Sequence, residues 1–207
     1  MHGPEVASHT VDPKRQTILR CARTAFVNEG YAATKIEPIA REAGVSTATL
    51  YALFDGKAQL FSAVIEDASD DFGAQMAGIR TLEGDARQQL LGFGQAYADF
   101  MSDPFVRAVF RLVMAERPRF QPVAREFFDR GRSAWGATLI SILITQSKAG
   151  ALRGMEHPSW AAGHLMGMIE HPVFFVPLVT GDEIKVRRSN AEVVQDAVET
   201  FLGRFGA

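Results

Sequence analysis

Residues 36–54 read IEPIAREAGVSTATLYALF and predict two short helices joined by a tight turn. The apolar residues of the first helix recur at helical spacing: Ile36, Ile39, Ala40 and Ala43. This spacing gives the helix one buried face. Gly44 can adopt the left-handed backbone conformation that ends a helix at low cost. Ser46 suits the N-cap of the second helix, because its hydroxyl can accept a hydrogen bond from a free backbone N–H.

The second helix is expected to expose small or hydroxyl-bearing side chains: Thr47, Ala48, Thr49 and Tyr51. Hydroxyls can donate to or accept from base edges, and the methyl groups of Ala and Thr can contact the methyl of thymine. The pattern is typical of a helix-turn-helix, whose second helix enters the major groove of DNA. Because this helix carries no Arg, Lys, Asn or Gln, we expect modest specificity per base pair. The alternative for Tyr51 is a place in the core beside Leu50 and Phe54.

The composition predicts a well-packed chain whose contacts with DNA are local. Of 207 residues, 47% are hydrophobic, which is enough for one large or two modest cores. The formal net charge is -2, with a slight basic excess in residues 1–61 and a slight acidic excess in residues 62–207. A protein that coats nucleic acid along its length would be far more basic, so that class is excluded.

The single cysteine, Cys21, excludes an intrachain disulfide and fits a reducing, cytoplasmic location. A partly buried small side chain is the favoured interpretation of Cys21, and a redox switch is the alternative. We expect no signal peptide, and no apolar run that reaches the roughly 18 residues of a membrane span.

The whole chain is predicted to be all-α, with about nine helices. Its expected parts are a mobile arm over residues 1–12, a helix-turn-helix domain over 13–61, and a helical ligand-binding and dimerisation domain over 62–207. Beyond Gly84, helices are predicted over residues 85–102, 104–117, 121–149, 158–179 and 189–205. Prolines separate several of these segments.

Several helix ends can be placed from single residues. Pro13 can begin the first helix and Gly30 can end it. Thr34 and Glu37 have the spacing of a capping box, and the next helix is predicted to start at residue 35 or 36. Lys57 then opens a longer helix that is expected to link the two domains.

Spaced residues in the first part of the chain form a recognisable set: Ala22, Ala25, Phe26, Gly30, Tyr31, Thr34, Ile36, Ile39, Ala40, Ala43-Gly44-Val45-Ser46, Thr49-Leu50-Tyr51, Phe54, Lys57, Leu60 and Phe61. This set resembles the N-terminal domain of TetR-family transcriptional regulators. A second set is Pro104-Phe105, Arg111-Leu112-Val113, Ala115-Glu116 and Arg119-Phe120. It resembles the AefR-like subset of ligand-binding domains in that family.

The resemblance implies a cytoplasmic homodimer that represses transcription until a small apolar or aromatic molecule binds the C-terminal domain. Two-fold symmetry would make the double-stranded operator a near-palindrome. The implied DNA-binding residues are Thr34, Lys35, Ile36, Ser46, Thr47, Ala48, Thr49, Tyr51 and Lys57. Lys57 would hold a phosphate. Leu53 stands where the family often has Tyr or His, so Tyr51 would carry more of the contact with DNA.

The C-terminal half is rich in aromatic and Met side chains, which suit an adaptable apolar site inside a helix bundle. The resemblance selects these ligand-binding residues: Phe93, Tyr97, Met114, Phe128, Trp135, His164 and Met168. It also implies a dimer interface on the last two helices, formed by Trp160, Leu165, Ile169, Val173, Val194, Val198 and Phe201.

A helical small-molecule sensor or enzyme, in which the N-terminal motif serves only structure, is the alternative function. No Ser/His/Asp order, metal-ligand cluster or glycine-rich phosphate loop supports catalysis, so we expect neither an enzyme nor a cofactor or metal. His157, His164 and His171 share one helical face, but seven residues rise about 10.5 Å, which is too far for one ion. Glu170 and His171 point about 100° apart on a helix, which argues against a proton-transfer pair. An activator would differ from a repressor only in operator placement.

Overall fold

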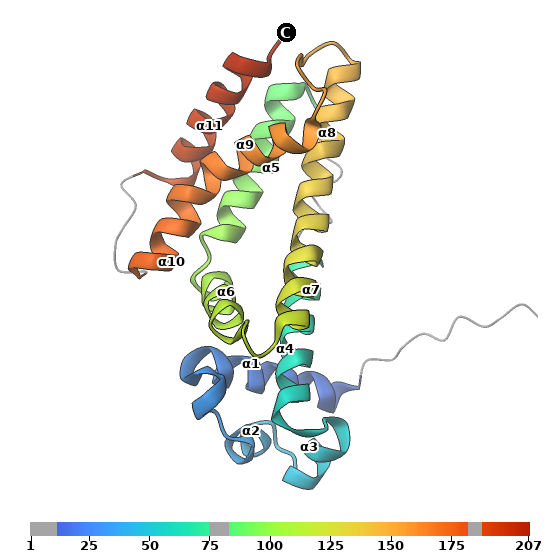
Figure 1. Cartoon of the computed structure of the whole chain (residues 1–207), viewed down its shortest axis with the longest axis vertical. Helices are drawn as coiled ribbons and strands as arrows, with labels where there is room; N and C mark the ends of the chain where they lie inside the picture. Colours follow the sequence, from blue (N-terminus) through green and yellow to red (C-terminus); the bar gives the residue numbers. More distant parts are fainter. Residues whose placement is uncertain (1–11, 75–82, 182–187) are drawn as a thin grey trace, which may run out of the picture. The chain divides into compact units, whose positions relative to one another are not determined.

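The computed structural model describes residues 12–74, 83–181 and 188–207, and every regular element within them is a helix. In chain order the α-helices are α1 (Pro13–Ala33), α2 (Ile36–Glu42), α3 (Thr47–Leu53), α4 (Gly56–Ala74), α5 (Ala86–Met101), α6 (Pro104–Glu116), α7 (Gln121–Gly131), α8 (Ala137–Lys148), α9 (Pro158–Glu170), α10 (Val176–Thr180) and α11 (Asn190–Phe205). Two π-helical segments, η2 (Arg132–Gly136) and η3 (His171–Phe175), join α7 to α8 and α9 to α10. When α7 to α8 and α9 to α10 are each counted as one continuous helix, the described residues form nine helices. This confirms the predicted all-α class (Figure 1).

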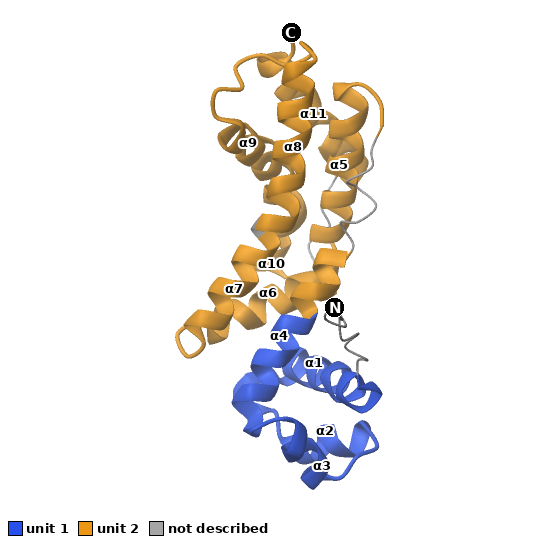
Figure 2. Cartoon of the chain, turned by 90° about the vertical axis from the view of Figure 1, so that its right-hand side faces the viewer, with its two compact units in different colours: residues 1–67 blue, residues 68–207 orange. Residues whose placement is uncertain are grey.

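The chain divides into two compact units, Met1–Asp67 and Ala68–Ala207 (Figure 2). Helix α4 begins in the first unit, and its last residues, 68–74, belong to the second. The boundary expected from the sequence, after residue 61, falls earlier in the same helix. A single helix therefore contributes side chains to both units.

Capping groups set the ends of α1 in the first unit. Residues 1–11 of the predicted arm lie outside the described residues. Asp12 caps the helix, because its carboxylate accepts from the backbone N–H of Lys14 at 2.9 Å. Pro13 follows as the first helical residue, as predicted. Gly30, at φ 77°, interrupts the regular helix near its C-terminal end.

The predicted capping box of Thr34 and Glu37 is wrong. Helix α2 does begin at Ile36, but its N-cap residue is Lys35, whose side chain makes no capping hydrogen bond. The hydroxyl of Thr34 instead donates to the carbonyl oxygen of Gly30 at 2.7 Å, and the side chain is buried at the end of α1. Thr34 therefore stabilises the preceding helix rather than the following one.

The turn before α3 has the predicted chemistry. Gly44 lies at φ 68°, in the left-handed region. The hydroxyl of Ser46 accepts from the backbone N–H of Thr49 at 3.0 Å and caps α3. Three aromatic rings in the core of this unit lie 5.2 to 5.9 Å apart: Phe26, Tyr31 and Phe61. These rings join α1 to α4.

In the second unit, α5, α8, α9 and α11 pack against one another. The segments predicted over residues 121–149 and 158–179 are helical throughout the described part, but each contains a π-helical turn. Pro172 lies within η3 and supplies no backbone N–H, so the regular α-helical hydrogen bonding cannot continue unchanged there.

Burial within this chain corrects the predicted dimer interface. Six of the residues assigned to it belong to the core of the single chain: Leu165, Ile169, Val173, Val194, Val198 and Phe201. They lie where α9, η3 and α11 pack with α5. Of the predicted set, Trp160 is exposed, at 69%. The sequence pattern could not distinguish a helix face that packs within the chain from one that packs on a second copy, because both faces are apolar.

One described segment, Pro158–Thr180, is long and apolar enough to cross a membrane by length and composition. This differs from the expectation that no apolar run reaches that length. The segment attains a mean hydropathy of 1.2 although it includes Glu170 and two histidines. Leu165 and Ile169 on this segment are fully buried in the helical bundle, so part of its apolar surface forms the core.

Gly94 marks a close approach of α5 to α9 and α11, and Gly94→Ala is expected to destabilise the protein by about 1–3 kcal/mol. A Cβ at this position would lie 2.7 Å from Cγ1 of Val194 and 3.3 Å from Cδ1 of Ile169. Urea unfolding followed by circular dichroism measures the change. Gly203→Ala on α11 is the control, because a Cβ there meets nothing within 4 Å. An unfolding free energy for Gly94→Ala equal to that of the parent would contradict this account of the packing.

Candidate nucleic-acid interface and internal cavity

Helix α3 exposes most of the side chains that the sequence assigns to base contacts. Thr47, Ala48 and Tyr51 are exposed, whereas Leu50 on the other side of the helix is fully buried. Thr49 is partly buried, and its hydroxyl lies 2.8 Å from the hydroxyl of Ser46. Figure 1 shows α2 and α3 as neighbours, in the arrangement expected of a helix-turn-helix.

Tyr51 belongs to the surface and not to the core. Its side chain is 52% exposed, whereas Leu50 and Phe54 are at most 2% exposed. The alternative interpretation, in which Tyr51 packs beside these two residues, is therefore wrong. About half of the surface of Tyr51 is therefore available to a partner.

The sequence assigns three residues between α1 and α2 to DNA binding. Of these three, Lys35 alone has an exposed side chain. Thr34 and Ile36 are buried, at 2% and 6% exposure. Their side chains position the start of α2 and do not reach solvent. A side-chain contact with a DNA phosphate at this place therefore depends on Lys35.

Lys57 is held against the first unit by two interactions. Its Nζ donates to the backbone carbonyl of Ala32 at 3.0 Å, and it lies 4.7 Å from the centre of the Tyr31 ring. Both interactions tie the start of α4 to the end of α1. Lys57 therefore has a structural role in addition to the phosphate contact predicted for it.

The second unit contains a cavity of about 340 Å³. Its wall includes residues of α4, α5, α6, α9 and the continuous helix from α7 to α8. Six lining rings contact one another in series, with centres 4.9 to 6.2 Å apart: Phe110, Phe127, Phe72, Phe100, Trp135 and Tyr97. A wall of this kind suits an apolar or aromatic molecule.

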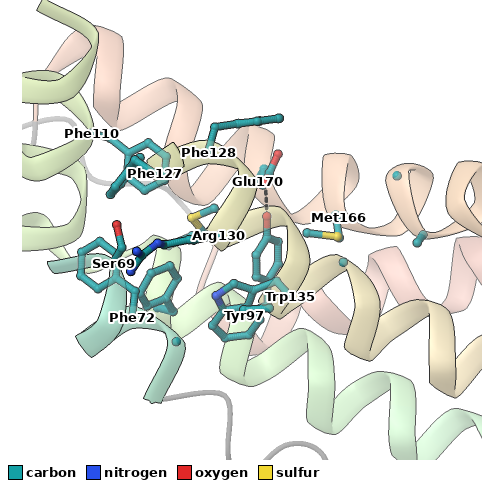
Figure 3. A pocket seen from close by; sticks show the side chains of 18 of the residues that line it. Ser69, Phe72, Tyr97, Phe110, Phe127, Phe128, Arg130, Trp135, Met166 and Glu170 are labelled. Carbon is teal, nitrogen blue, oxygen red and sulfur yellow. Dashed lines mark hydrogen bonds between the residues drawn. The ribbon is translucent and has the colours of Figure 1, made fainter. Parts of the chain in front are cut away.

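A carboxylate interrupts the apolar wall of the cavity. The hydroxyl of Tyr97 donates to Oε1 of Glu170, and Figure 3 shows the two side chains facing each other. Burial raises the pKa of Glu170 above its ordinary value of 4.5, because the ionised form loses hydration. The site therefore favours a partner that donates hydrogen bonds to this carboxylate or carries positive charge.

Arg130 is the other charged side chain among the described residues that line the cavity. Its guanidinium forms ion pairs with Asp70 at 2.6 Å and with Glu126 at 2.7 Å. Figure 3 shows Arg130 near Ser69, away from Glu170. Because two exposed carboxylates balance Arg130, the cavity has no excess of positive charge with which to attract an anion.

Two family models match the chain. The model of bacterial regulatory proteins of the tetR family matches residues 18–64, and the model of the C-terminal domain of AefR-like transcriptional repressors matches residues 88–207. The chain belongs to the TetR family. These models describe transcriptional regulators and not enzymes.

Relatives of this TetR-family protein agree with that assignment. The chain is 33% identical over 90 residues to the HTH-type transcriptional activator FasR of Mycolicibacterium smegmatis, a match that spans 44% of this chain and 41% of FasR. A solved TetR-family regulator from Mesorhizobium loti is similar with a TM-score of 0.73 and 25% identity, over 94% of this chain and 97% of that one. The solved flavonoid-responsive regulator FrrA is similar with a TM-score of 0.69 and 26% identity, over 93% and 97%.

The cavity of this TetR-family protein brings together three of the seven predicted ligand-binding residues: Tyr97, Phe128 and Trp135. The other four do not line it. Phe93 is fully buried behind the wall, where its ring stacks on Tyr97 at 5.8 Å. Met114 is exposed. The resemblance selects residues by the segments that carry them, but it does not show which side chains of those segments turn toward the cavity.

His164 and Met168 lie on other surfaces of α9. His164 is exposed, with its ring 6.3 Å from that of Phe205. Met168 lines a separate groove together with Val193 of α11. Neither residue is part of the aromatic cavity.

Sequence reasoning missed Glu170 as a cavity residue. The sequence pairs it only with its neighbour His171, which is exposed and stacks on Phe175 at 5.6 Å. The available signal was a carboxylate within the otherwise apolar segment Pro158–Thr180. A charged group in such a segment is costly unless it has a partner or a function.

The remaining candidate groups show no reactive arrangement. In the part of the chain that the structure describes, no group of three or more His, Cys, Asp or Glu side chains could hold a metal ion. His157 lies against the ring of Trp160 at 4.6 Å. Cys21 is buried, and burial raises the pKa of its thiol, which disfavours the reactive thiolate.

Replacement of Glu170 is expected to stabilise the ligand-free protein at neutral pH. Because the pKa of Glu170 is raised on folding, the folded state binds more protons than the unfolded state just above pH 4.5, and stability falls as the pH rises through that window. Glu170→Gln retains an acceptor for Tyr97 but cannot ionise. Its melting temperature should exceed that of the parent at neutral pH, and the difference should shrink toward pH 4.5. Glu156→Gln, at an exposed position, is the control. A difference that grows as the pH falls would contradict this prediction.

Proposed function

We propose that this protein is a cytoplasmic, homodimeric repressor that leaves a near-palindromic operator when a small apolar or aromatic molecule occupies its cavity. The observation that carries the DNA-binding part of the proposal is the exposed face of α3. Thr47, Ala48 and Tyr51 present hydroxyl and methyl groups there, and Ser46 caps the helix. These groups match the donors, acceptors and methyl groups on base edges in the major groove.

An exposed stripe of aromatic and apolar side chains on the helix from α9 to α10 supports dimerisation. TetR-family regulators act as dimers. The stripe consists of Trp160, His164, His171, Phe175 and Val179. Trp160, Phe175 and Val179 are each more than half exposed in the single chain. A two-fold interface would bury this stripe against the same stripe of a second copy. We therefore assign the interface to this stripe in place of the buried residues predicted from the sequence.

Helix α4 contributes residues both to the cavity and to the DNA-binding unit. Ser69 and Phe72 of this helix line the cavity, whereas its Phe61 packs in the core of the first unit. A molecule that displaces Phe72 would act on the helix whose earlier residues belong to the first unit. We propose that occupancy of the cavity changes how the two copies of α3 are presented to the operator.

The relatives support repression by an aromatic effector. The C-terminal family model is that of AefR-like repressors, and it matches residues 88–207. FrrA is named as flavonoid-responsive, and flavonoids are aromatic. FasR is named as an activator, but its match spans 44% of this chain. The aromatic wall of the cavity fits an effector of the same general chemistry.

Fluorescence anisotropy with the DNA upstream of the protein's own gene tests the proposal. We expect dissociation constants in the nanomolar range, as for other specific DNA-binding proteins, and much weaker binding to a scrambled duplex. Thr49→Ala should reduce the preference for the upstream DNA over the scrambled duplex, because Thr49 lies on α3. Equal binding to both duplexes, followed by failure of genomic selection to enrich any site, would contradict the proposal. In vitro transcription on the selected site then separates a repressor from an activator.

A further inference from the structure

We propose that the effector is an organic cation, a protonated amine or quaternary ammonium on an aromatic or apolar body, and that Glu170 is its counter-ion. This inference rests on the proposed function, because it names the chemical class of molecule that the regulator responds to. It depends on three features of the second unit: the charge of the cavity, the order of its rings and the bond between Tyr97 and Glu170.

The charges around the cavity favour a cation. Glu170 and Arg130 are the charged side chains among the described residues that line it. Arg130 is balanced by its ion pairs with Asp70 and Glu126. No basic side chain of the described lining therefore faces Glu170 as a counter-ion. A bound ammonium would supply the missing charge, whereas a bound carboxylate would lie in a cavity that already has an acidic excess.

The aromatic rings provide the second half of a cation site. Tyr97 and Trp135 lie 5.0 Å apart, and Phe100 is 5.1 Å from Trp135. All three rings line the same cavity as Glu170. The faces of aromatic rings attract cations, and this attraction strengthens where water is excluded. The farther rings, Phe72, Phe110 and Phe127, would contact the apolar body of the ligand.

The bond from Tyr97 distinguishes a cation from a phenol as the preferred ligand. The phenol of Tyr97 already donates to Glu170 and supplies the hydrogen bond that a phenolic ligand would offer. A neutral donor would add a second hydrogen bond but would leave the negative charge uncompensated. A cation brings the charge opposite to that of Glu170. It also brings either a hydrogen-bond donor, in a protonated amine, or a close contact with the carboxylate, in a quaternary ammonium.

Isothermal titration of the full-length protein with three matched probes tests this inference at neutral pH: naphthylmethylammonium, naphthylmethanol and naphthoate. The probes share one aromatic body and differ in charge. We expect the ammonium to bind at least about tenfold more tightly than the alcohol, a difference of about 1.4 kcal/mol, and naphthoate to bind most weakly.

Two variants of the cavity and one control variant assign the preference to the cavity. Glu170→Gln should weaken binding of the ammonium about tenfold or more and change binding of the alcohol much less, whereas Glu156→Gln should change neither. Ala134→Phe adds a ring to the cavity wall and should weaken both probes. Thermal unfolding followed by circular dichroism verifies that each variant is folded.

Three results would overturn the inference: no binding of the ammonium, an alcohol that binds as tightly as the ammonium, or a preference that survives Glu170→Gln. Anisotropy on operator DNA, measured with the same preparations, separates this failure from failure of the proposed function. Intact specific DNA binding without a preference for the ammonium refutes the cation alone. Preference for the ammonium without specific DNA binding refutes the repressor and leaves the cation site in place.

Discussion

Tyr51→Ala is expected to weaken operator binding by about 30-fold. Tyr51 is the large side chain exposed on α3, at 52%, and the neighbouring Leu53 can offer no hydrogen bond. A hydrogen bond with its apolar contact contributes about 1 kcal/mol. A dimer makes this contact in both half-sites, so about 2 kcal/mol, or about 30-fold in affinity, is lost. Fluorescence anisotropy at fixed salt concentration measures this change.

Two variants separate a DNA contact of Tyr51 from an effect on folding. Tyr51→Phe keeps the ring and removes the hydroxyl, so it should retain part of the affinity. Thr24→Ala removes an exposed hydroxyl from α1, where it donates to the carbonyl of Arg20, and should leave DNA binding unchanged. All three variants should unfold at nearly the same temperature, because the side chains are exposed. A Tyr51→Ala variant that binds the operator within threefold of the parent would refute the contact.

Phe175→Asp is expected to shift the protein from dimer to monomer and to weaken operator binding by more than about 100-fold. Phe175 is 52% exposed in the single chain and belongs to the exposed stripe on the helix from α9 to α10. At a two-fold interface, the change would place two carboxylates in an apolar contact, which costs several kcal/mol. A monomer would contact one half-site instead of two. Sedimentation velocity and anisotropy measure the two effects.

Ile144→Asp is the matched control for Phe175→Asp. Ile144 is an exposed apolar residue on α8, outside the stripe. This variant should remain dimeric and bind the operator as the parent does. If Phe175→Asp sediments as a dimer, the proposed interface is wrong, whatever the effect on DNA binding. If Ile144→Asp is the variant that dissociates, the interface lies on α8 instead.

Much of the fold could be predicted because the responsible interactions are local. Ser46 and the N–H of Thr49 are three residues apart, and Gly44 needs only its own backbone freedom to end the preceding helix. The same holds for Asp12 and Pro13 at the start of α1. Thr34 is the informative exception, because its hydroxyl could bond forward or backward along the chain. The buried junction selects the carbonyl of Gly30.

The site in the second unit was less accessible to prediction because its residues are far apart in sequence. Tyr97, Phe128 and Trp135 could be proposed from their chemistry, but Phe93 has the same chemistry and is buried behind the wall. Glu170 lies 73 residues from Tyr97, whose hydroxyl bonds to it. No spacing rule joins two such positions.

By itself, the sequence determined the all-α class, the helix-turn-helix and its exposed face, since helical period and capping depend on neighbours within a few residues. For the helix from α9 to α10, the tertiary structure alone decided which apolar side chains pack in the bundle, which stay exposed and which residues line the cavity. It buries Leu165 and Ile169 in the bundle, leaves Phe175 exposed, and places Glu170 in the aromatic cavity. The physical reason is that hydrophobicity drives burial without direction, so the partner of an apolar face is fixed by the packing of the whole unit and not by the face itself.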